Sequence, residues 1–150
     1  MAKKSKVGLK VPTANDMAKK YGSMIKLASE VTDTDLYIPS TFFALNYLFG
    51  KGIPYGKIVE IAGEESSGKS LVAYNFAYAT QQLGGHVIWV DAEQSWMNSW
   101  AEINGVDPAR VTIVNDTRIE YIADVVADLA IYLRSQLTHN EPILLSLIHI

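Results

Sequence analysis

Apolar runs of strand length alternate with stretches of helical periodicity over the last two thirds of the chain. The apolar runs occupy residues 57–62, 86–91, 111–114 and 142–150. Apolar positions three and four residues apart mark the stretches between them, at residues 70–83, 96–103 and 117 to about 137. Strands that alternate with helices predict an α/β fold, in which helices flank a parallel sheet.

Short motifs of glycine and of capping residues indicate where the predicted helices begin and end. Gly84-Gly85 ends the first helix, and Asn104-Gly105 ends the second. Thr117 and Glu120 have the spacing of a capping box at the start of the third helix. This helix is expected to turn one apolar stripe toward the sheet, made of Ile122, Val126, Leu129, Leu133 and Leu137.

The first third of the chain lacks this alternation. Residues 1–12 are rich in lysine and aperiodic, which indicates a mobile arm. Thr13 or Asn15 is placed to cap a helix that runs to about Ala28. The apolar stripe of this helix consists of Met17, Tyr21, Met24 and Ala28.

A linker is predicted over residues 29–40, followed by a short helix near residues 42–49 and a broken, turn-rich segment with three glycines and a proline. The predicted organisation is therefore an arm, helix and linker over residues 1–35, and a core that begins at residue 36 and extends to residue 144.

Composition and charge narrow the class of protein. Apolar residues make up 49% of the chain and charged residues 19%, which is typical of a globular protein. The net charge of −3 excludes a wholly basic nucleic-acid-binding surface, although residues 1–30 hold seven lysines against two acidic residues. The absence of cysteine excludes disulfides and thiolate zinc sites and favours a reducing compartment such as the cytoplasm. The three histidines are too scattered for metal binding, and no apolar run approaches the ~18 residues of a membrane span.

Residues 63–70 read Gly-Glu-Glu-Ser-Ser-Gly-Lys-Ser and fit the G-x-x-x-x-G-K-[S/T] pattern of phosphate-binding loops. Glycines at the two ends let the backbone wrap a phosphate without a Cβ clash, while successive N–H groups and a helix N-terminus attract its charge. Lys69 is expected to neutralise the β and γ phosphates, and the Ser70 hydroxyl to ligate Mg²⁺. The predicted nucleotide-binding residues are Gly63, Glu64, Glu65, Ser66, Ser67, Gly68, Lys69, Ser70 and Leu71. The competing interpretation is a glycine-rich surface turn.

Asp91-Ala92-Glu93 follows the apolar run at residues 86–91. A carboxylate at the C-terminal end of a parallel strand lies on the ligand-binding edge of such a sheet. Glu93 is therefore a candidate general base that orients a water toward the γ-phosphate. A helix-capping acid in the turn between strand and helix is the alternative.

Two tryptophans and two aspartates stand four residues apart on predicted helices. Trp96 and Trp100 are candidates for the core or an interface, and Trp100 is also placed to stack on adenine. Asp124 and Asp128 indicate a solvated helix face.

Residues 56–70, GKIVEIAGEESSGKS, resemble the RecA recombinase family, whose phosphate loop reads GPESSGKT after GRIVEI. The Asp-Ala-Glu at residues 91–93 is similar to the DAE of that family, and Gly105-Val106-Asp107 to its GVD. Asp116-Thr117 with Glu120 resembles its DTGEQ stretch, although Arg118 and Ile119 replace the central residues. The resemblance covers about residues 36–144, and the unusual sequence is similar to phage UvsX recombinases.

The resemblance implies a RecA-like ATPase core that binds ATP and Mg²⁺ at a protomer interface, assembles on single-stranded DNA and promotes strand exchange and repair. It implies that Glu93 is the catalytic glutamate and that Lys69 acts on the phosphates. The N-terminal helix would correspond to the arm that docks on a neighbouring protomer, in a bacterial cell or in the cytoplasm of a phage-infected host.

The chain departs from the family pattern near the nucleotide base and at its end. Met97 stands where the family has an Asp that contacts adenine, and Trp100 stands where it has a stacking Tyr. Trp100 can still stack on adenine, but Met97 cannot make the polar contact that the family's Asp makes with the base. The second Mg²⁺-site Asp, the two DNA-binding loops and the C-terminal region of the family have no counterpart here, so weak ATP binding and poor hydrolysis are expected of these 150 residues.

Residues 145–150 read Leu-Ser-Leu-Ile-His-Ile, where the family has a strand that ends in Asp. This hexapeptide is the translation, in one frame, of the transposon-end sequencing adapter CTGTCTCTTATACACATC. The hypothesis is that residues 145–150 are a non-native tail and that the gene continues past Leu144, with a short protein that ends in an apolar strand as the alternative.

Other functions remain open on the same motifs. A hexameric helicase or clock-type ATPase has a similar core. A non-catalytic nucleotide-binding or interaction module also fits the phosphate loop, and a small-molecule kinase is a weaker option.

Overall fold

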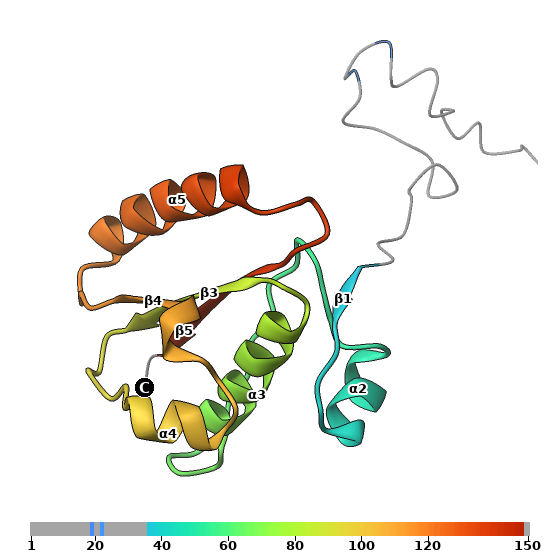
Figure 1. Cartoon of the computed structure of the whole chain (residues 1–150), viewed down its shortest axis with the longest axis vertical. Coiled ribbons are helices and arrows are strands. Elements are labelled where there is room, and N and C mark those ends of the chain that lie inside the picture. The colour runs from blue at the N-terminus through green and yellow to red at the C-terminus, as the bar shows by residue number, and fades with distance from the viewer. Residues whose placement is uncertain (1–18, 20–21, 23–35, 149–150) are drawn as a thin grey trace, which may run out of the picture. The chain divides into compact units, whose positions relative to one another are not determined.

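The computed structural model of the chain describes residues 19, 22 and 36–148 (Figure 1). The predicted lysine-rich arm and most of the helix predicted over residues 13–28 therefore lie outside the described residues. The described elements are β1 (Tyr37–Ile38), α2 (Phe43–Phe49), β2 (Ile53–Pro54), α3 (Lys69–Gln82), β3 (His86–Asp91), α4 (Asn98–Ile103), the 3-10 helix η3 (Pro108–Arg110), β4 (Val111–Val114), α5 (Ile119–Gln136) and β5 (Ile143–Ile148). No helix among these residues is both long enough and apolar enough to span a bilayer.

The main sheet has three parallel strands in the order β4-β3-β5. Val87 pairs with Val111 on one side and with Leu144 on the other. Five of the six residues of β3 are buried, because strands lie on both of its edges and helices on both of its faces. The predicted α/β fold with a parallel sheet is confirmed in this region, and the strands predicted at residues 86–91 and 111–114 have those bounds.

Alternate residues of β3 pack against different helices, as the period of a strand requires. Val87 and Trp89 face α3 and α4, whereas Ile88 and Val90 face α5. Figure 1 shows α5 on one face of the sheet and α3 and α4 on the other. The residues of α5 that pack on Ile88, Val90 and Val114 are Ile122, Val126, Leu129, Ala130 and Leu133, which confirms the predicted stripe up to Leu133.

An aromatic cluster fills the face between β3 and the two helices. The ring centroids of Tyr74 and Trp89 are 4.8 Å apart, and Trp96 lies 5.1 Å from Trp89 and 5.4 Å from Tyr74. Burial raises the pKa of the Tyr74 phenol, and the nearby Asp91 carboxylate raises it further. The prediction of a core position is thus confirmed for Trp96.

The prediction of a strand at residues 57–62 is wrong. This segment joins no ladder in the described residues, and the Ile58 side chain is 99% exposed. An apolar run indicates burial, but only backbone pairing with a neighbour makes a strand, and the ladders here join β3 to β4 and β5. Val59 and Ile61 line a cavity instead.

A second correction concerns the predicted linker and turn segment. Tyr37–Ile38 pairs antiparallel with Ile53–Pro54, so both segments contribute a short strand. Gly52, between α2 and β2, has φ of 126°, and a Cβ there would collide with the carbonyl of Ile38. The sequence pattern does not predict this close approach of the Gly52 and Ile38 backbones, because the two residues are distant in the sequence.

The capping box predicted at Thr117 and Glu120 does not form. Arg118 is the N-cap residue of α5, and its side chain makes no capping hydrogen bond. The Asp116 carboxylate instead accepts hydrogen bonds from the Arg118 backbone N–H at 2.8 Å and from its guanidinium, with Nη2 to Oδ2 at 2.7 Å. These bonds hold the pKa of Asp116 well below its usual range. The start of α5 is therefore held by Asp116 and Arg118 rather than by Thr117 and Glu120.

Candidate functional site

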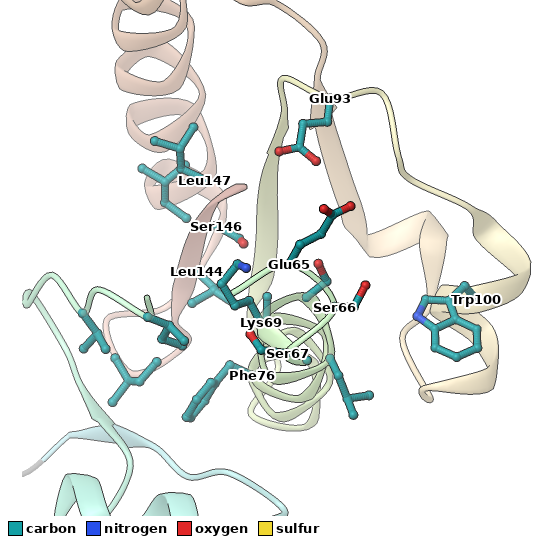
Figure 2. A pocket seen from close by; sticks show the side chains of 18 residues that line it. Glu65, Ser66, Ser67, Lys69, Phe76, Glu93, Trp100, Leu144, Ser146 and Leu147 are labelled. Carbon is teal, nitrogen blue, oxygen red and sulfur yellow. The ribbon is translucent and has the colours of Figure 1, made fainter. Parts of the chain in front are cut away.

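A cavity of about 510 Å³ lies beside the N-terminus of α3 (Figure 2). Its walls come from the loop before α3, the turn after β3, helix α4 and strand β5. Its size lies within the range of small-molecule sites. The cavity therefore brings together residues 65–71 of the loop motif, Glu93 and Trp100, whereas the predicted binding residues Gly63 and Glu64 do not line it.

The loop at residues 63–70 is closed on itself before α3 begins. The Ser67 N–H donates to the Glu64 carbonyl at 3.3 Å, and Gly68 has φ of 92°. A Cβ at Gly63 would approach the Ser67 hydroxyl to 2.7 Å. The backbone angle of Gly68 thus favours glycine, whereas a side chain at Gly63 would only displace the Ser67 hydroxyl.

The Lys69 side chain folds back along this loop. Its Nζ donates hydrogen bonds to the carbonyls of Gly63 at 2.9 Å and of Glu64 at 2.8 Å. Lys69 is the first residue of a 14-residue helix, so the ammonium lies where the positive end of the helix dipole also acts. This combination can bind an anion.

The remaining loop residues line the same cavity. Figure 2 shows the carboxylates of Glu65 and Glu93 directed toward a common space above the loop, with Ser66 and Ser67 below them. Ser70 and Leu71, in the first turn of α3, belong to the lining as well. A hydroxyl beside a bound phosphate fits Mg²⁺, which keeps most of its ligands as water and phosphate oxygens rather than using an all-protein cage.

Asp91 and Glu93 have different roles in the turn after β3. The Asp91 side chain is 2% exposed and accepts hydrogen bonds from the Ser95 N–H and Trp96 N–H, at 3.0 and 2.8 Å. The Ser95 hydroxyl donates to the same carboxylate at 3.2 Å. Asp91 therefore holds the turn between β3 and α4, and neither acid caps α4, whose N-cap is Met97. The Glu93 side chain lies exposed at the cavity.

Trp100 is 44% exposed and lines the cavity, unlike Trp96. Met97, at the N-cap of α4, is 58% exposed.

The predicted solvated face of α5 is confirmed, because Asp124 and Asp128 are both exposed.

The sequence pattern did not predict some of the residues that line the cavity. Residues Ile53, Val59, Ile61 and Leu144–Leu147 line it, although nothing in their spacing points to a ligand. They meet the loop because β5 lies beside β3 while the segment at residues 57–62 runs along the cavity, and both placements are tertiary.

Replacing Asp91 with Asn is expected to lower the free energy of unfolding by about 1–3 kcal/mol, because the amide puts a donor against the N–H groups of Ser95 or Trp96 in a buried place. Urea denaturation measures this loss.

Asp107→Asn is the matched control, because the exposed Asp107 carboxylate accepts one backbone bond, from Ala109 at 2.9 Å. The control is expected to cost less than about 1 kcal/mol. Equal losses in the two variants would contradict the role of the buried Asp91 carboxylate in holding the turn.

Comparison with known proteins places these residues in a family. The model of the family described as the RecA N-terminal domain matches residues 11–132. The chain is 32% identical over 108 residues to a protein named Protein RecA from Gloeothece citriformis, in an alignment that covers 72% of this chain and 30% of the relative. Proteins of the same name from Nocardioides sp. and Mycolicibacterium vanbaalenii are 41% and 39% identical over 87 residues, which is 57% of this chain and 25% of each relative. The chain thus spans about a quarter to a third of the length of these curated relatives.

Proposed function

Because the chain belongs to the RecA family, we propose that it supplies the nucleotide-binding part of an ATP-dependent DNA recombinase and that its cavity binds the nucleotide. The observation that carries the proposal is the meeting of two motifs. The Lys69 ammonium over the loop at residues 63–70 and the Glu93 carboxylate after β3 belong to one cavity.

In this proposal the phosphates bind at the loop. The N–H groups of residues 67–70 and the N-terminus of α3 supply donors. For this the Ser67 N–H turns from the Glu64 carbonyl, and the Lys69 ammonium from the loop carbonyls, to the phosphates. The Ser70 hydroxyl would hold Mg²⁺, which supplies charge neutralisation at the phosphate oxygens. Trp100 provides a stacking surface for the base.

Glu93 orients the attacking water and accepts its proton. Its carboxylate is free to do so because Asp91 holds the turn through its own hydrogen bonds. The side chain projects into the cavity from the turn after β3, separately from the loop that would hold the phosphates.

The wider activity follows from the family. We propose assembly on single-stranded DNA, strand exchange, and filament contacts through residues 1–35, with residues 36–144 as the ATPase core. The absence of cysteine fits a reducing cytoplasm. Electron microscopy with DNA and ATP tests this assembly, since helical filaments support it and closed rings favour a helicase-type ATPase.

Replacing Lys69 with Ala is expected to weaken MgATP binding by roughly 10- to 100-fold, because the variant loses the charged hydrogen bonds to the phosphates. Isothermal titration calorimetry on the whole chain measures the dissociation constant.

Lys57→Ala is the matched control for the loss of one positive charge, since Lys57 is exposed and does not line the cavity. It is expected to bind MgATP as the unaltered chain does. If Lys69→Ala also bound MgATP normally, the cavity would not be the nucleotide site.

A further inference from the structure

Two residues other than glycine have a positive φ in the described part of the chain, Ser66 at 60° and Gln94 at 53°. A left-handed backbone is uncommon for residues that carry a side chain, and it persists where the surrounding contacts impose it. Ser66 lies within the loop and lines the cavity, whereas Gln94 directly follows Glu93. The unfavourable conformation of Gln94 therefore adjoins the residue proposed as the general base.

The turn that carries Glu93 is fixed at both of its ends. At its start, Asp91 is the last residue of β3 and belongs to the ladder with β5. At its end, the N–H groups of Ser95 and Trp96 donate to the buried Asp91 carboxylate at 3.0 and 2.8 Å. The backbone of residues 92–94 must therefore join two points that the rest of the protein holds in place.

The backbone angle of Gln94 makes this connection. Its N–H donates to the Asp91 carbonyl at 3.3 Å, which closes a turn around Ala92 and Glu93. The positive φ then directs the next two N–H groups back to the Asp91 carboxylate. With a negative φ at Gln94, either those hydrogen bonds break or the dihedral angles of residues 92 and 93 change. Both changes displace the Glu93 side chain.

The side chain of Gln94 has no comparable part in the site. It is exposed and does not line the cavity. The carboxylate of Glu93, in contrast, is directed toward the space above the loop (Figure 2). What Gln94 contributes at this place is thus the direction of its backbone.

We propose that Gln94 is a positioning residue for Glu93, and that it acts through its left-handed backbone conformation rather than through its side-chain amide. The inference rests on the proposed function, because it presupposes that Glu93 orients the attacking water. A displacement of a reacting group by about 1 Å can slow a reaction by about 100-fold. The backbone angle of a residue outside the cavity can therefore control the rate of hydrolysis.

Two substitutions of Gln94 test this in opposite directions, with single-turnover ATP hydrolysis by the whole chain at saturating MgATP as the measurement. Gln94→Gly removes the side chain but favours a positive φ, and is expected to hydrolyse ATP within about twofold of the unaltered chain. Gln94→Val keeps a side chain but disfavours a positive φ, and is expected to slow hydrolysis by roughly 10- to 100-fold. The affinity for MgATP, measured by calorimetry, is expected to change by less than about twofold in both variants, because the phosphate contacts belong to the loop.

Gln82→Val is the matched control. Gln82 is exposed at the end of α3, does not line the cavity and has no positive φ. Circular dichroism checks that each variant is folded. If Gln94→Val does not fold, Gln94→Thr carries the same test, because threonine is also β-branched but its hydroxyl can hydrogen-bond to the nearby backbone. It is expected to slow hydrolysis by at least about threefold.

The double variant Glu93→Gln with Gln94→Val separates positioning from a general structural role. If Gln94 acts through Glu93, the double variant is expected to hydrolyse ATP within about threefold of the rate of Glu93→Gln alone. Independent effects on the rate would multiply instead.

Each other outcome has a distinct meaning. A loss in Gln94→Gly as large as that in Gln94→Val would overturn the inference, because the side chain would then be the active part. A normal rate in the folded β-branched variant, or losses that multiply in the double variant, would also overturn it and leave Glu93 as the proposed base. A normal rate in Glu93→Gln, or no hydrolysis by the unaltered chain, would overturn the role proposed for Glu93, and the inference with it.

Discussion

Replacing Glu93 with Gln is expected to slow ATP hydrolysis by roughly 10²- to 10⁴-fold and to change MgATP affinity by less than about twofold. Glutamine keeps the size of the side chain but cannot accept the proton of the attacking water. Substrate binding is retained because the phosphate contacts belong to the loop and to Lys69, which the substitution leaves intact.

The structure makes this separation of binding from hydrolysis possible. The side-chain hydrogen bonds of the turn after β3 all end on Asp91, so the loss of the Glu93 charge does not disturb the turn. The Glu93 side chain is exposed, and its replacement is expected to leave the free energy of unfolding within about 0.5 kcal/mol.

Single-turnover hydrolysis of radiolabelled ATP, with and without single-stranded DNA, measures the slow rates expected of these 150 residues. Glu65→Gln removes a carboxylate charge from the same cavity, and Glu102→Gln removes one from the exposed face of α4. A loss in Glu65→Gln as large as that in Glu93→Gln would show that charge in the cavity, rather than a base at one position, controls the rate.

Replacing Trp89 with Ala is expected to lower the free energy of unfolding by about 3–5 kcal/mol, because it leaves a large cavity in the middle of the sheet. Trp89 is 2% exposed on the central strand and packs between Tyr74 and Trp96. The loss therefore affects three elements at once, namely α3, β3 and the turn before α4.

Urea denaturation followed by far-UV circular dichroism measures this effect without depending on tryptophan fluorescence. Trp89→Phe is a graded control, because it keeps an aromatic ring and removes an indole N–H that has no hydrogen-bond partner in the described residues. Trp89→Phe is expected to cost less than about 2 kcal/mol. Trp100→Ala is the matched control for an exposed position, and a similar loss there would contradict the assignment of the core to Trp89.

Regular periodicity accounts for what the sequence predicted well. The strand at residues 86–91, the helix that begins at the phosphate loop and the inward stripe of α5 each follow from hydrophobic spacing within a single element. The loop of residues 63–70 was recognisable because its glycines, lysine and serine serve local backbone and phosphate geometry.

The errors arise where another contact, distant or local, competes with the pattern that was read from the sequence. The run at residues 57–62 has the composition of a strand, but pairing with a neighbour decides whether a strand forms. Thr117 and Glu120 have the spacing of a capping box, but the Asp116 carboxylate bonds to Arg118 at the start of the helix instead. Tyr37–Ile38 gives no strand signal, yet it pairs with Ile53–Pro54 across 15 residues.

Local sequence patterns were enough to predict the strands β3 and β4, the phosphate loop and Glu93 as a candidate base, because these depend on neighbours within a few residues. Packing between distant elements settled that Asp91 holds the turn while Glu93 faces the cavity, and that Trp96 is packed in the core while Trp100 borders the cavity. The residues of each pair have the same local signal, and they differ only in what the sheet and α3 place beside them.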